Sequence, residues 1–329
     1  MATAKEIAKA LGVSEAAVSI ALNGKPGVSE GLRRKVRETA QAMGYNFAKL
    51  SRNEKRDIVF IIFLKSGAII TDTPFFEQLF KGIAAECRKQ KVHLTTIYSN
   101  TRDDLIYSLR TLPRESGLIL LATEMEEADC LPVAESAVPH VILDAYFENV
   151  DSNYVLINNV HGAFNATDYL IRRTGKQPGY LRSSYPIANF EERADGFYKA
   201  VRFNGMSTSN CVVHRLCPSA EGAYSDMREI LRAGDKLSEC YFADNDLIAA
   251  GAIRALKDAG KRIPEDIAVI GFDDISLCEF LDPPLSTINV PKEYMGSQSV
   301  LRLLSIMENN EIYQTKTEIA TQLVKRKSC

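Results

Sequence analysis

From residue 57 onward, short apolar runs alternate with longer amphipathic stretches, and this alternation limits the possible folds more than any other feature of the sequence. The apolar runs have the length of buried strands, and the amphipathic stretches repeat their apolar residues at helical spacing. The expected strands are 58–64, 93–98, 117–122, 138–144, 240–243 and 268–272, and the expected helices are 77–90, 162–173, 193–203 and 246–259. Because connecting helices pack on the faces of parallel sheets, two α/β lobes are predicted, with ligands bound at the carboxyl ends of the strands.

The length and composition of the chain limit the number of domains and the class of protein. The chain has 329 residues, of which 46% are hydrophobic, so two or three packed domains are expected. No run of about 18 apolar residues occurs and the N-terminus lacks an apolar signal segment, so we expect a cytoplasmic protein without a membrane span. Seven cysteines form no CxxC pair, which favours reduced thiols over a metal or redox site.

Positive charge is concentrated at the N-terminus. Residues 1–56 carry 11 basic and five acidic residues, a net charge of +6, which leaves −8 for the remainder of a chain whose total is −2. A basic segment on an acidic body is typical of a small nucleic-acid-binding module, because phosphate neutralisation supplies most non-specific affinity for DNA. A solvated basic surface is the alternative.

The first 45 residues have the pattern of three short helices. Thr3 and Glu6 are spaced as a capping box for a helix that ends at Gly12. Ser14 and Ser29 are suitable N-caps for the second and third helices. The second helix would direct one set of side chains inward, Val18, Ala21 and Leu22, and another outward, Glu15, Ala16, Ser19 and Ile20. Two helices joined at a glycine turn have the layout of a helix-turn-helix DNA-binding module.

This pattern resembles the DNA-binding head of the LacI-GalR family of bacterial transcription regulators, and the resemblance covers AKEIAKALGVSEAAVSIALNGKPGVSEGLRRKVRETAQAMGY. It implies that the second helix enters the major groove of DNA. The residues that match base-contacting positions of the family are Glu15, Ala16 and Ile20, and those that match phosphate-contacting positions are Thr3, Ser14, Ser19 and Asn23. In the linker that follows, Leu50 matches a leucine that wedges into the minor groove.

Two departures from the family pattern concern DNA recognition. Ile20 stands where the family commonly has arginine, and isoleucine can offer only an apolar contact, for instance to a thymine methyl group. Glu15 can accept a hydrogen bond from cytosine but also brings negative charge close to phosphates. The linker is shorter than the common pattern and lacks its usual proline, so a plain flexible tether is the alternative to a hinge helix.

The resemblance extends over nearly the whole chain, through the segments 73–76, 142–144, 158–163, 192–197, 245–246, 263–274 and 283–288. It implies an N-terminal all-α helix-turn-helix headpiece followed by a two-lobed sensor of the type I periplasmic-binding-protein fold, with parallel sheets flanked by helices. The expected divisions are a headpiece at 1–45, a linker at 46–57, an N-terminal lobe at 58–157 and 289–317, and a C-terminal lobe at 158–288 and 318–329.

The same resemblance assigns the effector contacts to Phe75, Phe76, Asp144, Arg193, Asn245 and Asp273. Donor and acceptor groups of this kind suit the neighbouring hydroxyls of a sugar, and an aromatic side chain suits the face of its ring. The alternatives are an ion pair between the lobes for the polar residues and a core position for the phenylalanines. Val290 stands where the family often has a polar residue, and the segment around Cys217 lacks a stacking aromatic. The alternatives to a sugar are therefore a purine, another small metabolite or no ligand.

The sequence as a whole predicts a transcriptional regulator, a repressor, that binds double-stranded operator DNA as a homodimer under the control of a small-molecule effector. No nucleophile is paired with a base and no phosphate-binding glycine loop occurs, so we expect neither an enzyme nor a bound cofactor or metal. The alternatives are a sensor whose degenerate head no longer binds DNA and a transported-solute-binding protein, which the basic head disfavours.

Overall fold

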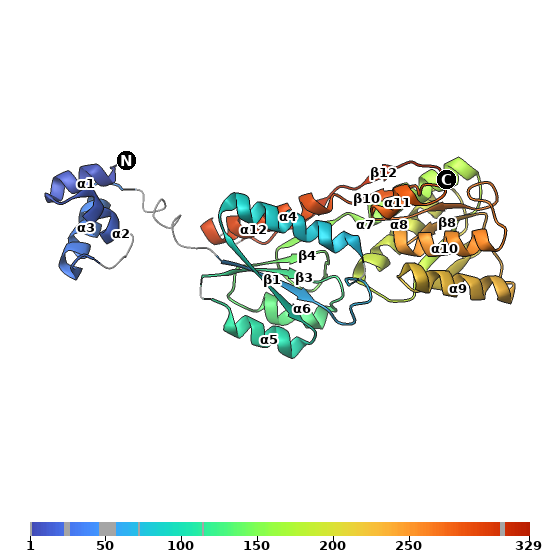
Figure 1. Ribbon diagram of the computed structural model, residues 1–329, viewed down its shortest axis with the longest axis horizontal. Helices are drawn as coiled ribbons and strands as arrows, with labels where there is room; N and C mark the ends of the chain where they lie inside the picture. Colours follow the sequence, from blue (N-terminus) through green and yellow to red (C-terminus); the bar gives the residue numbers. More distant parts are fainter. Residues whose placement is uncertain (1, 23–26, 46–56, 72, 114, 310–312) are drawn as a thin grey trace. The chain divides into compact units, whose positions relative to one another are not determined.

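The computed structural model describes residues 2–22, 27–45, 57–71, 73–113, 115–309 and 313–329. The chain divides into two compact units, one within residues 1–56 and one from Asp57 to Cys329 (Figure 1). Each unit has a hydrophobic core of its own. None of the helices in the described ranges is long and apolar enough to cross a bilayer.

The first unit consists of three helices, α1 (Ala4–Leu11), α2 (Glu15–Leu22) and α3 (Glu30–Ala42). The three expected caps are confirmed. The Glu6 N–H donates to Thr3 Oγ1 at 3.3 Å, and the Glu6 carboxylate accepts from the Thr3 N–H at 2.7 Å. Ser14 Oγ accepts from the Ala17 N–H at 3.1 Å, and Ser29 Oγ accepts from the Leu32 N–H at 3.3 Å. The three helices bury a common core, Ile7, Ala8, Val18, Ala21, Leu22, Val36 and Ala40.

The N-terminal lobe of the second unit contains a six-stranded parallel sheet with the order β11-β5-β4-β3-β1-β2. Its strands are β1 (Asp57–Phe63), β2 (His93–Ser99), β3 (Gly117–Leu121), β4 (His140–Leu143), β5 (Tyr154–Ile157) and β11 (Lys316–Ile319). The helices α4 (Pro74–Gln90) and α12 (Lys292–Asn309) cover one face, and α5 (Arg102–Thr111) and α6 (Glu127–Ala134) cover the other (Figure 1). Alternate residues of β1 therefore enter two different cores.

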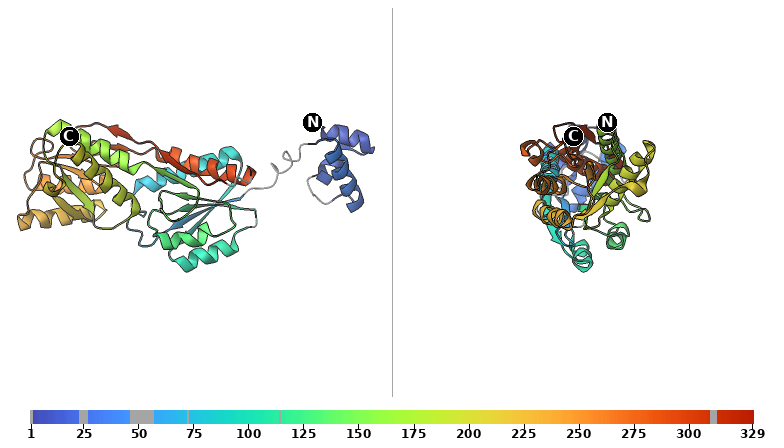
Figure 2. Two further views of the ribbon diagram at one scale, coloured as in Figure 1. Left: turned by 180° about the vertical axis from the view of Figure 1, so that it is seen from behind. Right: turned by 90° about the vertical axis from the view of Figure 1, so that its right-hand side faces the viewer.

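The C-terminal lobe contains a four-stranded parallel sheet with the order β7-β6-β8-β9. Its strands are β6 (Gly179–Ser183), β7 (Val213–Leu216), β8 (Cys240–Ala243) and β9 (Ala268–Ile270). The helices α7 (Asn159–Thr174) and α8 (Ala188–Phe203) form one pair, α9 (Ala220–Ala233) and α10 (Asp246–Asp258) another, and η3 (Thr208–Asn210) and α11 (Leu277–Phe280) are short. Figure 2 shows that the C-terminus lies on this lobe. The expected α/β class with parallel sheets is confirmed.

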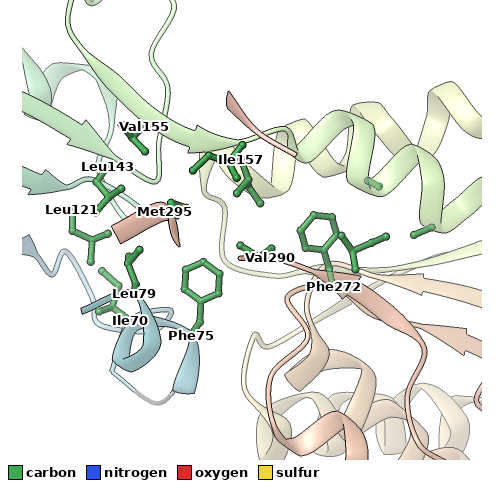
Figure 3. Close-up of a cluster of buried hydrophobic side chains, with 14 of the residues drawn as sticks. Ile70, Phe75, Leu79, Leu121, Leu143, Val155, Ile157, Phe272, Val290 and Met295 are labelled. Carbon is green, nitrogen blue, oxygen red and sulfur yellow. The ribbon is translucent and has the colours of Figure 1, made fainter. Parts of the chain in front are cut away.

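The chain passes between the lobes after β5, after β10 (Thr287–Asn289) and between β11 and β12 (Gln322–Val324). β10 and β12 pair as an antiparallel ribbon, and β11 continues in the six-stranded sheet to Ile319. One hydrophobic cluster spans both lobes at these passages. Figure 3 shows Val290 between Phe75 of the N-terminal lobe and Phe272 of the C-terminal lobe. The lobes therefore share a core beside the passages.

Several elements begin earlier than the sequence pattern indicates. α4 begins at Pro74, three residues before the expected start, because Thr73 Oγ1 accepts from the Phe75 N–H at 3.4 Å and proline suits the first turn of a helix. α8 begins at Ala188 and not at Arg193. The pattern also did not predict α12 or the ribbon of β10 and β12.

Candidate functional site

A polar cavity lies between the two lobes, at the carboxyl ends of strands from both sheets. The six side chains expected from the sequence all line it, Phe75, Phe76, Asp144, Arg193, Asn245 and Asp273. Six further residues line it that the sequence did not identify, Ile69, Thr73, Thr123, Ile187, Asn189 and Phe190. The free volume is about 30 Å³, which leaves room only for water. The space between the lobes at this site is therefore largely filled by the protein's own side chains.

Arg193 lies on α8 and is only 4% exposed. Its Nε donates to Asn159 Oδ1 at 2.9 Å, and its Nη1 donates to the Asp244 carbonyl at 2.6 Å. Its Nη2 lies 3.1 Å from Asp273 Oδ1, and the guanidinium carbon lies 3.8 Å from the centre of the Phe272 ring. Arg193 and Asp273 both belong to the C-terminal lobe, so the expected alternative of an ion pair between the lobes does not apply to them. These contacts fix the plane and direction of the guanidinium.

Asp273 lies three residues after β9, the edge strand of its sheet, and has a φ of 108°, in the left-handed range. Burial raises the pKa of its carboxyl group, and the positive charges of Arg193 and Lys292 oppose that rise. The neighbouring Asp274 has a structural role, because its Oδ1 pairs with Arg326 at 2.8 Å and its Oδ2 accepts from Asn289 Nδ2 at 2.9 Å. Asp273 is therefore the carboxylate of this pair that the cavity can use.

Asp144 follows β4 and faces the cavity from the N-terminal lobe. Its Oδ2 accepts from Thr123 Oγ1 at 2.6 Å, and burial raises the pKa of its carboxyl group to about 7. Its main-chain carbonyl accepts from Asn189 Nδ2 of the other lobe at 3.0 Å. Asn245 caps α10 through Oδ1, which accepts from the Ile248 N–H at 2.8 Å, so Nδ2 is the atom that Asn245 can offer a ligand.

The two phenylalanines of α4 differ in their surroundings. Their rings meet edge to face, with centroids 4.9 Å apart and planes at 66°. Phe75 is buried in the core that spans both lobes, whereas Phe76 is half-buried and packs against the cluster of Ile69, Ile187 and Phe190. Phe76 is therefore better placed than Phe75 to contact a ligand. Phe75 also occupies a core position, which is the alternative role for the phenylalanines.

The cleft is closed by apolar contacts that cross it. Ile69 of the N-terminal lobe packs against Ile187 and Phe190 of the C-terminal lobe. The loop that carries Ile69 is held by the buried carboxylate of Glu124. Glu124 Oε2 accepts the main-chain N–H groups of residues 66 and 67 at 2.9 and 2.8 Å, and its Oε1 accepts those of residues 69 and 70 at 2.8 and 3.4 Å. No sequence pattern identified Glu124, because its partners are more than 50 residues away.

In the first unit, α2 presents the face that the sequence predicted. Glu15, Ala16 and Ser19 are exposed and Ile20 is half-buried. The side-chain oxygens of Thr3 and Ser14 cap α1 and α2, so both residues stand at helix N-termini, where main-chain N–H groups attract anions. The remaining expected contacts, Asn23 and Leu50, lie outside the described residues.

Comparison with known proteins identifies the family. The model of "Bacterial regulatory proteins, lacI family" matches residues 3–46, and that of "Periplasmic binding protein-like domain" matches residues 167–329. The ribose operon repressor of Haemophilus influenzae is 30% identical over 96% of this chain and 95% of its own length. The HTH-type transcriptional repressor PurR of Aliivibrio salmonicida is 28% identical over 100% of this chain and 99% of its own length.

Among solved structures, a Lac repressor dimer bound to operator and the anti-inducer ONPF shares the fold, with a TM-score of 0.74. It is 23% identical, and the match covers 99% of this chain and 98% of that one. The helical head, the two α/β lobes and the relatives agree with one another. The chain belongs to the LacI family of bacterial regulatory proteins and is a DNA-binding transcriptional repressor that responds to an effector, not an enzyme.

Proposed function

We propose that this repressor binds operator DNA as a homodimer and that a sugar in the cleft between the lobes controls its affinity for the operator. The division of the chain follows that function, with a DNA-binding headpiece at 1–45, a linker at 46–57, an N-terminal lobe at 58–157 and 289–317, and a C-terminal lobe at 158–288 and 318–329. The last boundary moves by two residues, because β11 pairs with β5 of the N-terminal lobe as far as Ile319. A homodimer presents two heads to two half-sites, so the operator is roughly palindromic.

The proposed DNA contacts lie on and around α2. Exposed Glu15 and Ala16, with Ile20, are the base-contacting residues, and Thr3, Ser14, Ser19 and Asn23 contact phosphate, with Leu50 in the minor groove. The net charge of +6 on residues 1–56 supports this role, because it supplies the attraction to phosphate that the acidic remainder cannot. The exposed face of α2 lacks the arginine that commonly reads guanine, so apolar contact by Ile20 contributes to sequence preference.

The arrangement of donors and acceptors in the cleft carries the proposal of a sugar. Two carboxylates, Asp144 and Asp273, face the same cavity and need O–H or N–H donors. Arg193 and Asn245 add donors beside them, so neighbouring hydroxyl groups, each both donor and acceptor, satisfy the whole set. The half-buried ring of Phe76 can meet the apolar face of a sugar ring. The name of the relative from Haemophilus influenzae, ribose operon repressor, also supports a pentose.

A nucleobase is the second candidate for the effector. It is favoured by the similarity to PurR and by the aromatic residues of the cleft. The edge-to-face arrangement of Phe75 and Phe76 provides no pair of parallel rings between which these two residues could hold a planar base.

The closed cleft indicates how an effector would act. Ile69, Ile187 and Phe190 pack against one another across the cleft, and the free volume beside them holds only water, so a ligand must move side chains or separate the lobes to bind. It then replaces the ion pair of Arg193 and Asp273 with its own contacts. A ligand can shift the equilibrium between lobe positions only by its difference in affinity for them. The same shift would change the affinity of the heads for DNA.

A thermal-shift screen of monosaccharides and nucleobases, with D-ribose as the first probe, tests the effector. A ligand at 100 times its Kd raises the free energy of unfolding by about 2.7 kcal/mol, which is readily detected as an increase in Tm. We expect D-ribose or another monosaccharide to raise the Tm of the wild type and to have no effect on Arg193→Ala. A shift from nucleobases alone would replace the sugar by the second candidate, and a shift unchanged in Arg193→Ala would contradict the proposed contacts.

Selection of bound fragments from random duplex DNA tests the head. We expect the full chain to enrich a roughly palindromic motif and residues 57–329 alone to enrich none. Absence of any motif for the full chain, or retention of binding by residues 57–329, would contradict the proposal and favour a sensor with a degenerate head.

A further inference from the structure

Lys292 is a buried lysine at the first position of α12. It is only 2% exposed, and its Nζ donates to three main-chain carbonyls, those of Asp273 at 2.5 Å, Asp274 at 3.2 Å and Val290 at 3.2 Å. Its Nζ also lies 5.7 Å from the centre of the Phe75 ring. Lysine is rarely buried, because the loss of hydration must be offset by hydrogen bonds and opposite charge. The position of this ammonium group therefore calls for an explanation in terms of its partners.

Two of those partners have unusual main-chain conformations. Asp273 and Asp274 are consecutive residues with φ values of 108° and 53°, although neither is glycine. Strained conformations of this kind persist only where the surroundings hold them, and they gather at functional sites. Lys292 donates hydrogen bonds to the main-chain carbonyls of both Asp273 and Asp274, and the Asp273 N–H donates to the Ile288 carbonyl at 2.9 Å. The lysine thus helps to hold the conformation that directs Asp273 to the cavity.

The contact also joins the two lobes. Lys292 begins a helix that packs on α4 and on the sheet of the N-terminal lobe, whereas Asp273 follows β9 of the C-terminal lobe. Val290, the third carbonyl partner, lies in the passage between the lobes, between Phe75 and Phe272 in Figure 3. A change in the position of Asp273 would therefore alter the hydrogen bonds of Lys292 at the N-terminus of α12.

We propose that Lys292 is a positioning residue that fixes Asp273 for the effector and transmits the state of that contact to α12 of the N-terminal lobe. This inference rests on the proposed function of the cleft. It assigns to Lys292 a role in ligand affinity and in coupling that a lysine needed only for folding would not have.

The test compares Lys292→Met and Lys292→Gln with the wild type and with Lys81→Met in the full chain. Lys81 of α4 is exposed and pairs with Glu293 of α12 at 2.6 Å. Its replacement therefore removes a lysine contact of α12 without altering the contacts of Asp273. Hydrogen exchange of the segment 271–277 in the ligand-free protein reports on the strained turn, and calorimetric titration with D-ribose reports on the cleft.

For Lys292→Met we expect exchange in 271–277 to rise at least tenfold, with other core segments within twofold of the wild type, and the affinity for D-ribose to fall at least tenfold. Lys292→Gln keeps hydrogen-bond donors without the charge, so its effects should be smaller, and Lys81→Met should behave as the wild type. If Lys292→Met fails to fold, Lys292→Gln provides the test. Faster exchange confined to 271–277 would support the proposal, and faster exchange spread evenly over both lobes would overturn it.

The outcomes separate the two proposals. If the wild type binds D-ribose and Lys292→Met binds it within twofold, with unchanged exchange, the role of Lys292 is refuted while the sugar effector stands. If the wild type binds no monosaccharide but exchange in 271–277 rises only in the Lys292 variants, the positioning of Asp273 is supported and the proposed effector class fails.

Discussion

Replacement of Glu124 by glutamine should release the loop that closes the cleft. The buried carboxylate accepts four main-chain N–H groups of residues 66–70, two on each oxygen. Glutamine is of the same size but keeps only one acceptor oxygen, and its NH2 group would face two N–H donors. The substitution therefore removes half of the hydrogen bonds without leaving a cavity.

The size of the effect follows from the number of bonds lost. A hydrogen bond to a charged group contributes about 1.5–3 kcal/mol, so two lost bonds correspond to about 3–6 kcal/mol before relaxation. Because residue 66 is partly exposed and water can replace part of the loss, we expect the free energy of loop opening to fall by about 2–4 kcal/mol. A fall of about 2 kcal/mol corresponds to roughly 30-fold faster amide exchange.

Hydrogen exchange of residues 66–70 measures this change directly. The matched control is Glu126→Gln, since Glu126 is 75% exposed and pairs with Lys65 at 2.8 Å, a surface contact of little energetic weight. We expect at least 30-fold faster exchange in the loop for Glu124→Gln and less than twofold for Glu126→Gln. An increase below threefold for Glu124→Gln, or equal increases in the two variants, would refute the assignment of the loop to this carboxylate.

Two further predictions concern packing and pH. A Cβ atom on Gly296 would lie 2.3 Å from the Leu79 carbonyl, so Gly296→Ala should lower the free energy of unfolding in urea by about 1–3 kcal/mol. Gly31 has open space around it in α3, so Gly31→Ala should instead slow exchange in that helix about twofold, and the opposite signs would contradict the packing argument. Burial raises the pKa of Asp144 from 3.8 to about 7, so between these values the folded state holds a proton that the unfolded state has released, and the free energy of unfolding falls by up to about 1.4 kcal/mol per pH unit as pH rises. Urea titrations should therefore show Asp144→Asn gaining stability relative to the wild type between pH 5 and pH 8, and an unchanged difference would show that the burial of Asp144 does not set its pKa.

The sequence predicted the elements whose signals are local. Caps such as Thr3 and Ser29 act within one turn of a helix, and strands such as β1 are continuous apolar runs, so both could be recognised without tertiary information. α12 was not predicted because its inner face includes Lys292, Gly296 and Ser299, which are polar or small and hide the helical period. Tertiary contacts with α4 determine that face.

The candidate site shows the same division. The six expected side chains gather at one cavity because parallel strands bring their carboxyl ends to the same edge of each sheet. The sequence did not identify Asn189, whose role depends on a hydrogen bond to the Asp144 carbonyl of the other lobe, or Glu124, whose partners come from a distant loop. Lys292 was missed for the same reason, since its carbonyl partners are main-chain groups that leave no mark in the sequence.

The central claim is that occupation of the cleft controls binding of DNA, and one measurement tests it most directly. The affinity of the full chain for its selected operator is measured with and without a saturating concentration of the monosaccharide identified in the thermal screen. The account predicts a change of about 5–150-fold, and the same factor must appear in the affinity for the sugar when operator is present. Operator affinities that agree within twofold with and without the sugar, when a separate titration shows that the sugar binds, would contradict it.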